Sequence, residues 1–227
     1  MYDKQRFTLY QGCFLVMSFC ILWVCFPIGG SLDLALIDPW VSKSGQFLLR
    51  DNWYLAELNH RYVKDLLILV YASFLVLWLG SFKFETIKSL RWNYGYFFCM
   101  VIFSTSIIGL LKSQSAHACP WNTTIPTPQG FFWDFSTTKG HCFPGGHAST
   151  GFALMAGYFV FRQSNQKRAY FFLFSGLILG FAMGWAQMMR GAHFLSHNLW
   201  TAWIIWLINV IFYLLYDKKF NLVQEQP

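Results

Sequence analysis

The amino-acid sequence predicts an all-α integral membrane protein with a single domain spanning residues 1–227. Of these residues, 56% are hydrophobic and only 12% are charged, whereas soluble domains usually carry about 25% charged residues. Apolar runs of helix length recur along the whole chain, and a membrane-spanning helix needs about 20 such residues. The net charge of +7 does not indicate nucleic-acid binding, because the basic residues form short clusters between apolar runs instead of one stripe.

Six apolar runs are expected to cross the membrane as helices. They cover about residues 8–28, 66–82, 94–111, 148–162, 169–189 and 198–216. We expect the first to be retained, because it is longer than a typical signal-peptide core and the sequence 27–30 is a poor cleavage site. The fourth is short and contains Gly151 and Gly157. It can span only if other helices enclose it, where small residues allow close packing.

Basic residues mark alternate connections between these runs. They are Lys4 and Arg6, then Lys83, Lys88 and Arg91, then Arg162, Lys167 and Arg168, and finally Lys218 and Lys219. The positive-inside rule places these connections and both termini in the cytoplasm. All the histidines fall on the opposite side: His60, His117, His141, His147, His193 and His197. This asymmetry favours a functional site on the outer face.

Two outer segments are expected to cover the end of the bundle. In residues 31–65, an approximate helical stripe predicts an interfacial helix with Asp51 as its cap; the stripe consists of Phe47, Leu48, Trp53, Tyr54, Leu58 and Tyr62. This helix serves either lipid recognition or packing over the bundle. The proline-rich loop 112–147 carries an aromatic cluster at 131–135. It is either a lid-like outer loop that dips into the membrane or a packing element.

Cys119 and Cys142 border this loop on the predicted outer side. The outer compartment oxidises thiols, so we predict a disulfide between them, the alternative being two unpaired thiols. Such a bridge would contribute on the order of 3 kcal/mol. The other cysteines lie within apolar runs, where they act as small apolar fillers.

Three short pieces of the chain carry groups suited to breaking a phosphoester. They are Lys112 with Cys119-Pro120, then Pro144-Gly145-Gly146-His147, then Arg190 with His193 and His197. A neutral histidine can attack phosphorus, and a protonated one can donate to the leaving oxygen. Lysine and arginine can hold the non-bridging oxygens. Backbone N–H groups in a glycine turn before a helix add further donors.

These pieces resemble the motifs of the type 2 phosphatidic acid phosphatase superfamily, membrane lipid phosphatases related to the vanadium haloperoxidases. The first family motif is Lys, six residues, then Arg-Pro, and here Lys112 precedes Cys119-Pro120 by the same spacing. The second, Pro-Ser-Gly-His, corresponds to residues 144–147. The third is Arg, five residues, His, three residues, Asp, and Gly191-Ala192-His193-Phe194 matches the surroundings of its histidine.

The resemblance implies roles for individual residues. His193 would be the nucleophile that forms a phosphohistidine. His147 would be the general acid and then the base that activates water. Lys112 would bind the phosphate together with the backbone of Gly145 and Gly146. No metal or other cofactor is implied.

The sequence departs from the family pattern at several positions. Cys119 replaces an arginine, and Gly145 replaces a serine. Gln187 stands where the family has arginine, and Arg190, three residues later on the same helix face, could supply the missing guanidinium. His197 aligns with the family aspartate and is followed by Asn198. Either could orient His193, but neither brings negative charge. Asp134 in the outer loop is a speculative substitute.

Several functions follow from the resemblance. The first is a lipid phosphatase at the outer face of a bacterial inner membrane, acting on undecaprenyl diphosphate, phosphatidic acid, phosphatidylglycerol phosphate or lipid A. The alternatives are a lipid phosphotransferase and a non-catalytic lipid-phosphate binder or transporter. A metal site is a further alternative, because His193 and His197 are four apart. Membrane lipids and the substrate are the expected partners, and the sequence gives no oligomeric state.

Overall fold

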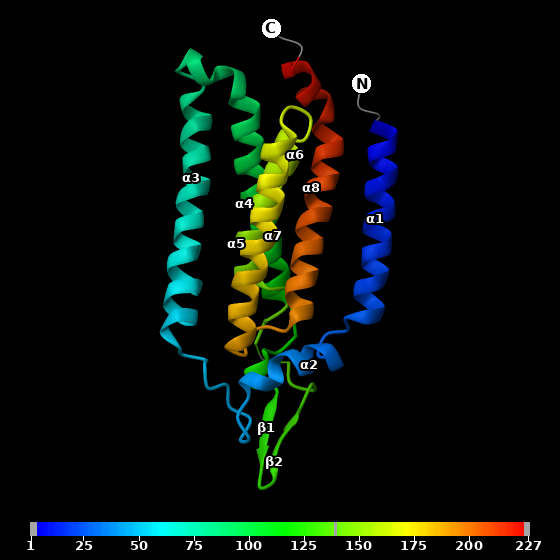
Figure 1. Ribbon diagram of the computed structural model, residues 1–227, viewed down its shortest axis with the longest axis vertical. Coiled ribbons are helices and arrows are strands. Elements are labelled where there is room, and N and C mark those ends of the chain that lie inside the picture. The colour runs from blue at the N-terminus through cyan, green and yellow to red at the C-terminus, as the bar shows by residue number, and fades with distance from the viewer. Residues whose placement is uncertain (1–3, 139, 225–227) are drawn as a thin grey trace.

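The computed structural model describes residues 4–138 and 140–224, with the backbone alone at 60 and 217–224. Long helices run side by side in it (Figure 1). Five helices within the described part are long and apolar enough to cross a membrane. They are α1 (Lys4–Cys25), Tyr54–Gly80 containing α3 (Lys64–Gly80), Glu85–Gln114 containing α4 (Arg91–Gln114), α7 (Gln166–Met189) and the Leu195–Tyr216 part of α8 (Leu195–Gln224). These helices agree with the prediction of a multi-pass helical membrane protein, with five candidate spans in the described part where six were predicted.

The predicted span 148–162 is not one uninterrupted helix. It consists of three short helical pieces, α5 (Gly146–Phe152), η5 (Ala153–Met155) and α6 (Ala156–Phe161). Most of its side chains are buried between the longer helices. A Cβ added at Gly151 would lie 2.5 Å from the Gly180 backbone nitrogen of α7. Glycine thus permits the close packing that this segment was expected to need, although the segment itself is too short to count among the spans.

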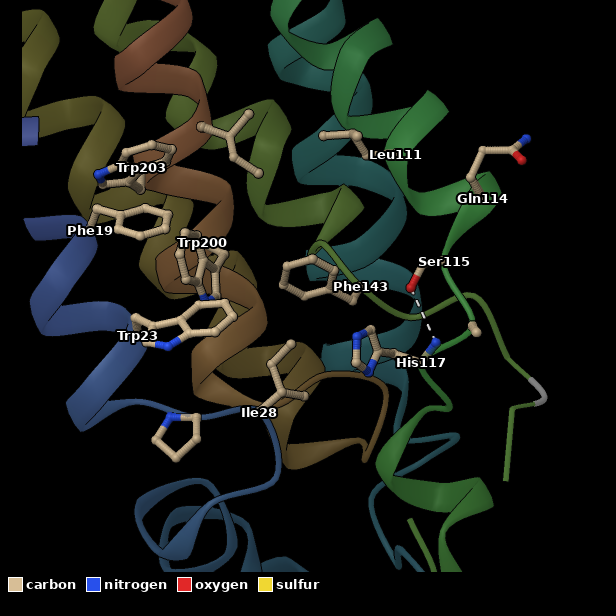
Figure 2. Close-up of a pocket in the computed structure, with 13 residues that line it drawn as sticks. Phe19, Trp23, Ile28, Leu111, Gln114, Ser115, His117, Phe143, Trp200 and Trp203 are labelled. Atoms are coloured by element: carbon tan, nitrogen blue, oxygen red, sulfur yellow. Dashed lines mark hydrogen bonds between the residues drawn. The ribbon is translucent and has the colours of Figure 1, made fainter. Parts of the chain in front are cut away.

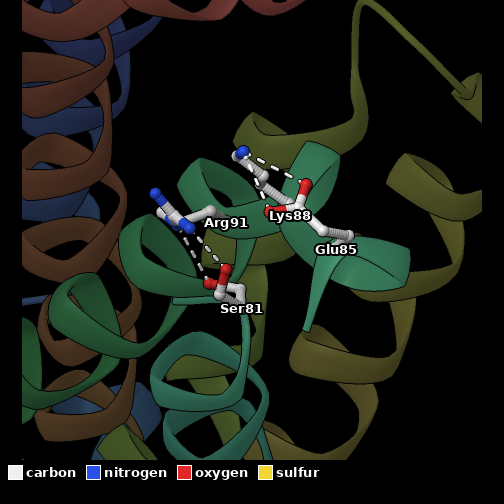
Figure 3. Close-up of polar contacts among 4 residues, drawn as sticks. All are labelled: Ser81, Glu85, Lys88 and Arg91. Atoms are coloured by element: carbon white, nitrogen blue, oxygen red, sulfur yellow. Dashed lines mark hydrogen bonds and ion pairs between the residues drawn. The ribbon is translucent and has the colours of Figure 1, made fainter. Parts of the chain in front are cut away.

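Both termini lie at one end of the bundle, and α2 (Ser31–Ile37) lies at the other with the only two strands described (Figure 1). At the terminal end, polar contacts stabilise the connection between α3 and α4 (Figure 3). Arg91 donates to the backbone carbonyl and hydroxyl of Ser81, and Lys88 pairs with Glu85 at 3.1 Å. This arrangement agrees with the basic connections expected at that end.

The interfacial helix predicted for segment 31–65 is not formed as one helix. After α2 and η1 (Asp38–Trp40), residues 41–52 form no helix. The π-helix η2 (Tyr54–Val63) then continues directly into α3. Asn52, not Asp51, caps this start, because its Oδ1 accepts a hydrogen bond from the Tyr54 N–H at 3.0 Å. Of the stripe, only Phe47 is buried, so the stripe does not form one packed face.

The outer loop contains an antiparallel hairpin that the all-α prediction lacked. Strand β1 (Thr124–Thr127) pairs with β2 (Gly130–Trp133), with Thr124 opposite Trp133 and Thr127 opposite Gly130. The Trp133 and Phe135 rings lie 6.5 and 6.3 Å from the Phe194 ring. Part of the aromatic cluster therefore packs against the start of α8, as the packing alternative predicted; a lid function stays a prediction.

Candidate functional site

The three motifs meet at the end of the bundle opposite the termini. Lys112 lies in the last turn of α4, Gly146 begins α5, and His193 lies in the turn between α7 and α8. A Cβ added at Gly146 would lie 3.5 Å from the Lys112 Nζ. The first and second motifs are therefore in direct contact, with an ammonium group beside the glycine turn.

His193 is the centre of this cluster. Its side chain is 2% exposed. Burial lowers the pKa of His193 well below its ordinary value of 6.5, and the nearby Lys112, His197 and His147 lower it further. The imidazole is consequently neutral at neutral pH, the form that a nucleophile requires. Lys112, His197 and His147 therefore lie close enough to His193 to act on its charge, and their catalytic roles stay predictions.

His197 occupies the position of the family aspartate and faces His193 directly. The two Nδ1 atoms are 3.4 Å apart, and the His197 ring is held against Phe143 and Phe194 at 5.5 and 5.3 Å between centroids. A hydrogen bond between two Nδ1 atoms requires one to be protonated and the other not. The Cys142 carbonyl is also a hydrogen-bond partner of both rings. A His193 ring that donates through Nδ1 to either acceptor keeps its Nε2 lone pair available for attack, so His197 and this carbonyl together can fix the tautomer without bringing negative charge.

Arg190 and Gln187 form hydrogen bonds that stabilise the turn between α7 and α8. Arg190 Nε donates to the Arg50 carbonyl at 2.7 Å, and its Nη1 donates to Gln187 Oε1 at 3.3 Å. The Gln187 carbonyl accepts from the N–H groups of Ala192 and His193. Gln187 therefore holds both Arg190 and the backbone at the nucleophile, whereas a contact of Arg190 with phosphate stays a prediction.

The glycine turn contacts α8 through Thr201, a residue that the sequence did not predict. The Thr201 hydroxyl accepts from the Gly145 N–H at 2.8 Å and donates to the His197 carbonyl at 2.7 Å. Beside it, the buried Asn198 amide fills the space next to Gly145. A Cβ at Gly145 would lie only 2.5 Å from Asn198 Oδ1. Glycine at this position therefore leaves room for the asparagine amide on the facing helix, which a serine side chain would have to displace.

Asp134 is half-buried in the outer loop. Its Oδ1 accepts from the N–H and hydroxyl of Ser136, which lowers its pKa, and a role as the substitute carboxylate stays a prediction. The buried acid is Asp33 in α2, which contacts Ser196 next to His197. The sequence indicated Asp33 only through its position as an acidic residue within the short apolar segment 31–37.

The predicted disulfide between Cys119 and Cys142 is present. Beside it, the Cys142 N–H donates to the His117 carbonyl at 2.9 Å. The bridge closes a loop across a separation of 23 residues and ties the start of the outer loop to the turn that leads into Pro144. It therefore connects the first motif to the second covalently.

Replacing both bridged cysteines by serine is expected to lower the free energy of unfolding by about 3 kcal/mol, because the unfolded chain regains the freedom of that loop. Denaturant unfolding in detergent without reductant measures the change. Cys99→Ser, which alters an exposed free cysteine of α4, is the matched control. Equal unfolding midpoints for the double variant and this control would contradict the prediction.

An open apolar groove of about 1000 Å³ is lined by residues of α1, α4, α8 and the turn at Phe143 (Figure 2). Trp23 of α1 and Trp200 and Trp203 of α8 form one wall, while Phe143 and His117 lie across from them. The Phe143 and His117 rings also lie 5.5 and 6.5 Å from the His197 ring. The groove therefore runs next to the site and offers a surface on which hydrocarbon can pack.

The metal alternative finds no additional ligand in the described part of the chain, where no three His, Cys, Asp or Glu side chains are placed to hold an ion together. The Nδ1 atoms of His193 and His197 instead face each other. Two imidazole nitrogens at this separation can also share a tetrahedral metal ion, so the metal alternative stays a prediction.

The stability of the protein is expected to fall as the pH drops below 6.5, the ordinary pKa of His193. The folded state holds this ring neutral, whereas the unfolded chain takes up a proton, so acid favours unfolding. The contribution of neutral His193 to the free energy of unfolding is fully present above pH 6.5. It is lost as the pH falls toward the lowered pKa of His193 in the folded state. Thermal unfolding between pH 5 and 7, compared between wild type and His193→Gln, measures it; parallel pH profiles would exclude this origin.

One comparison with known proteins gives a match. A family model described as PAP2 superfamily matches residues 93–221. These residues contain the three motifs, the outer hairpin and helices from α4 to α8. No curated protein and no solved structure matches the chain.

Proposed function

The chain belongs to the PAP2 superfamily, and from this membership and the geometry of the site we propose that it is a metal-independent lipid phosphatase. Phosphatase activity on phosphate esters is what the family suggests. The proposal adds a lipid phosphate or diphosphate as substrate and a histidine nucleophile.

In the proposed reaction, the Nε2 lone pair of His193 attacks phosphorus and forms a P–N bond. The bond from phosphorus to the leaving oxygen breaks, and protonated His147 gives that oxygen a proton. His147, now neutral, takes a proton from water, whose oxygen attacks phosphorus and releases phosphate from His193. Lys112 stabilises the non-bridging oxygens throughout, and the Gly146 backbone and Arg190 are the further donors that we assign.

The observation that carries this proposal is the environment of His193. A buried neutral imidazole lies in contact with His197 and is surrounded by Lys112 and His147. Lys112 brings a positive charge to this point, and the imidazoles add hydrogen-bond donors. Such a group of side chains suits the binding of an anion, and a phosphate group has the required charge.

The membrane setting supports a lipid as substrate. The site lies at one end of a bundle of apolar helices, and an apolar groove runs beside it. We propose the outer face of a bacterial inner membrane as its location, with the site facing the periplasm. Undecaprenyl diphosphate, phosphatidic acid, phosphatidylglycerol phosphate and lipid A remain the candidate substrates.

Phosphate release from these four lipids, measured in detergent with a chelator present, tests the proposal. Release into water supports a phosphatase. Transfer to a second lipid without free phosphate would indicate the phosphotransferase alternative. Saturable binding without any turnover would indicate the non-catalytic binder. Activity that chelator abolishes and zinc restores would contradict the metal-free mechanism.

A further inference from the structure

A buried carboxylate connects three segments at the start of α8. Asp33 of α2 is 3% exposed. Its Oδ1 accepts the Ser196 N–H at 2.9 Å, and its Oδ2 accepts the Ser196 hydroxyl at 2.5 Å and the Gly29 N–H at 2.9 Å. The contact joins residues that are 163 positions apart. Asp33 also lies outside the part of the chain that the family model matches, residues 93–221.

These hydrogen bonds place Asp33 in the role of a helix cap. The first helical residue of α8 is Leu195, and a cap accepts the N–H of the second or third residue, here that of Ser196. Phe194, which precedes the helix, has no side-chain acceptor, so the cap comes from α2. Burial raises the pKa of this carboxyl. The three donors and the positive end of the α8 dipole offset the cost of burial.

The capped turn also carries the partner of the proposed nucleophile. Ser196 immediately precedes His197, whose Nδ1 faces the Nδ1 of His193 at 3.4 Å. A shift of the first turn of α8 would change this distance directly, because the His197 ring is fixed to that turn. No acidic side chain other than that of Asp33 is buried in the described chain.

We propose that Asp33 is a positioning residue: by capping α8 through Ser196, it keeps His197 in hydrogen-bond register with His193 and so keeps the His193 Nε2 lone pair available. This rests on the proposed phosphatase function. The carboxylate that the third family motif lacks here is thereby replaced by one acting through the helix terminus, without contact with the nucleophile.

Asp33→Asn tests the inference, because asparagine keeps the shape but has only one accepting oxygen and no charge. We expect kcat for phosphate release to fall roughly 10- to 100-fold, the range typical of outer-shell partners. KM should change by less than about twofold, since ground-state binding is untouched. Asp38→Asn, at an exposed position five residues later, is the matched control and should change neither value.

A second measurement tests the inference without depending on turnover. The ¹⁵N chemical shifts of the His193 ring nitrogens report the tautomer, and in the histidine-labelled protein His193→Gln assigns them. Asp33→Asn should convert a single tautomer into a mixture, whereas Asp38→Asn should not. If Asp33→Asn fails to fold, Ser196→Ala replaces it; loss of the hydroxyl alone should change the same signals to a smaller extent.

The outcomes separate this inference from the proposed function. The inference is overturned if Asp33→Asn keeps the wild-type kcat and the wild-type His193 shifts. If Asp33→Asn does not fold, unchanged His193 shifts in Ser196→Ala overturn it. A lower melting temperature with unchanged shifts would also overturn it, because Asp33 would then be a structural anchor only. If wild type releases no phosphate from any lipid but the shifts still change, the proposed function fails while the positioning role stands.

Discussion

Replacing His193 by alanine is expected to lower kcat for phosphate release by at least about 10³-fold, the loss typical when a catalytic nucleophile is removed. The variant lacks the Nε2 lone pair, so the phosphohistidine cannot form and Lys112 and His147 are left around an empty position. Phosphate release from the preferred lipid, measured at saturating substrate, gives the ratio. Labelling from a radioactive headgroup, followed by peptide mapping, should place phosphate on His193 in the wild type only.

The control for this experiment is His141→Ala. His141 is an exposed histidine of the outer loop whose Nδ1 lies 2.6 Å from the Ser115 carbonyl, so its loss perturbs the same region without touching the nucleophile. Unfolding midpoints of both variants show how far each substitution alters the fold, because His193 is buried and His141 has a positive φ of 44°. If His193→Ala releases phosphate as fast as His141→Ala does, His193 is not the nucleophile and the reaction needs a different one.

Which connections lie at the same end of the bundle was predictable, because charge at the ends of apolar runs is a local signal. The connection between α3 and α4, which carries Lys83 and Lys88, lies at the end that holds both termini (Figure 1), while the side of the membrane stays a prediction. The helical span expected at 148–162 was harder to judge, because its three short pieces depend on glycine contacts with α7 that only the folded bundle reveals. The hairpin was missed because prolines indicated an irregular loop, and the packing of Trp133 against Phe194 joins residues far apart in the sequence.

The site was predictable to the extent that its residues lie in short motifs. Lys112, His147, His193 and His197 were named from spacing and resemblance, and they come together around His193. Thr201 and Asp33 were missed for a different reason. Each acts on a motif from another part of the chain, Asp33 across 163 residues, and no local pattern encodes such a contact.

The departures from the family pattern at Gly145 and Asn198 are coupled in the structure, which leads to the second large effect. Gly145→Ser is expected to destabilise the protein by about 1–3 kcal/mol, the usual cost of overpacking a filled site. The new Cβ would lie 2.5 Å from Asn198 Oδ1. Relief requires movement either of the turn that carries His147 or of the helix that carries His197, so phosphate release should fall by at least about tenfold.

Adding Asn198→Ala to Gly145→Ser should restore much of the lost stability and activity, because alanine removes the amide that the serine meets. The double-mutant cycle should therefore give a coupling energy of about 1 kcal/mol or more. Gly109→Ser, at a helical position where an added Cβ has no neighbour within 4 Å, controls for the serine substitution itself. Strictly additive effects of Gly145→Ser and Asn198→Ala would mean that the two positions vary independently, and the family serine would then be absent for a reason unrelated to the asparagine.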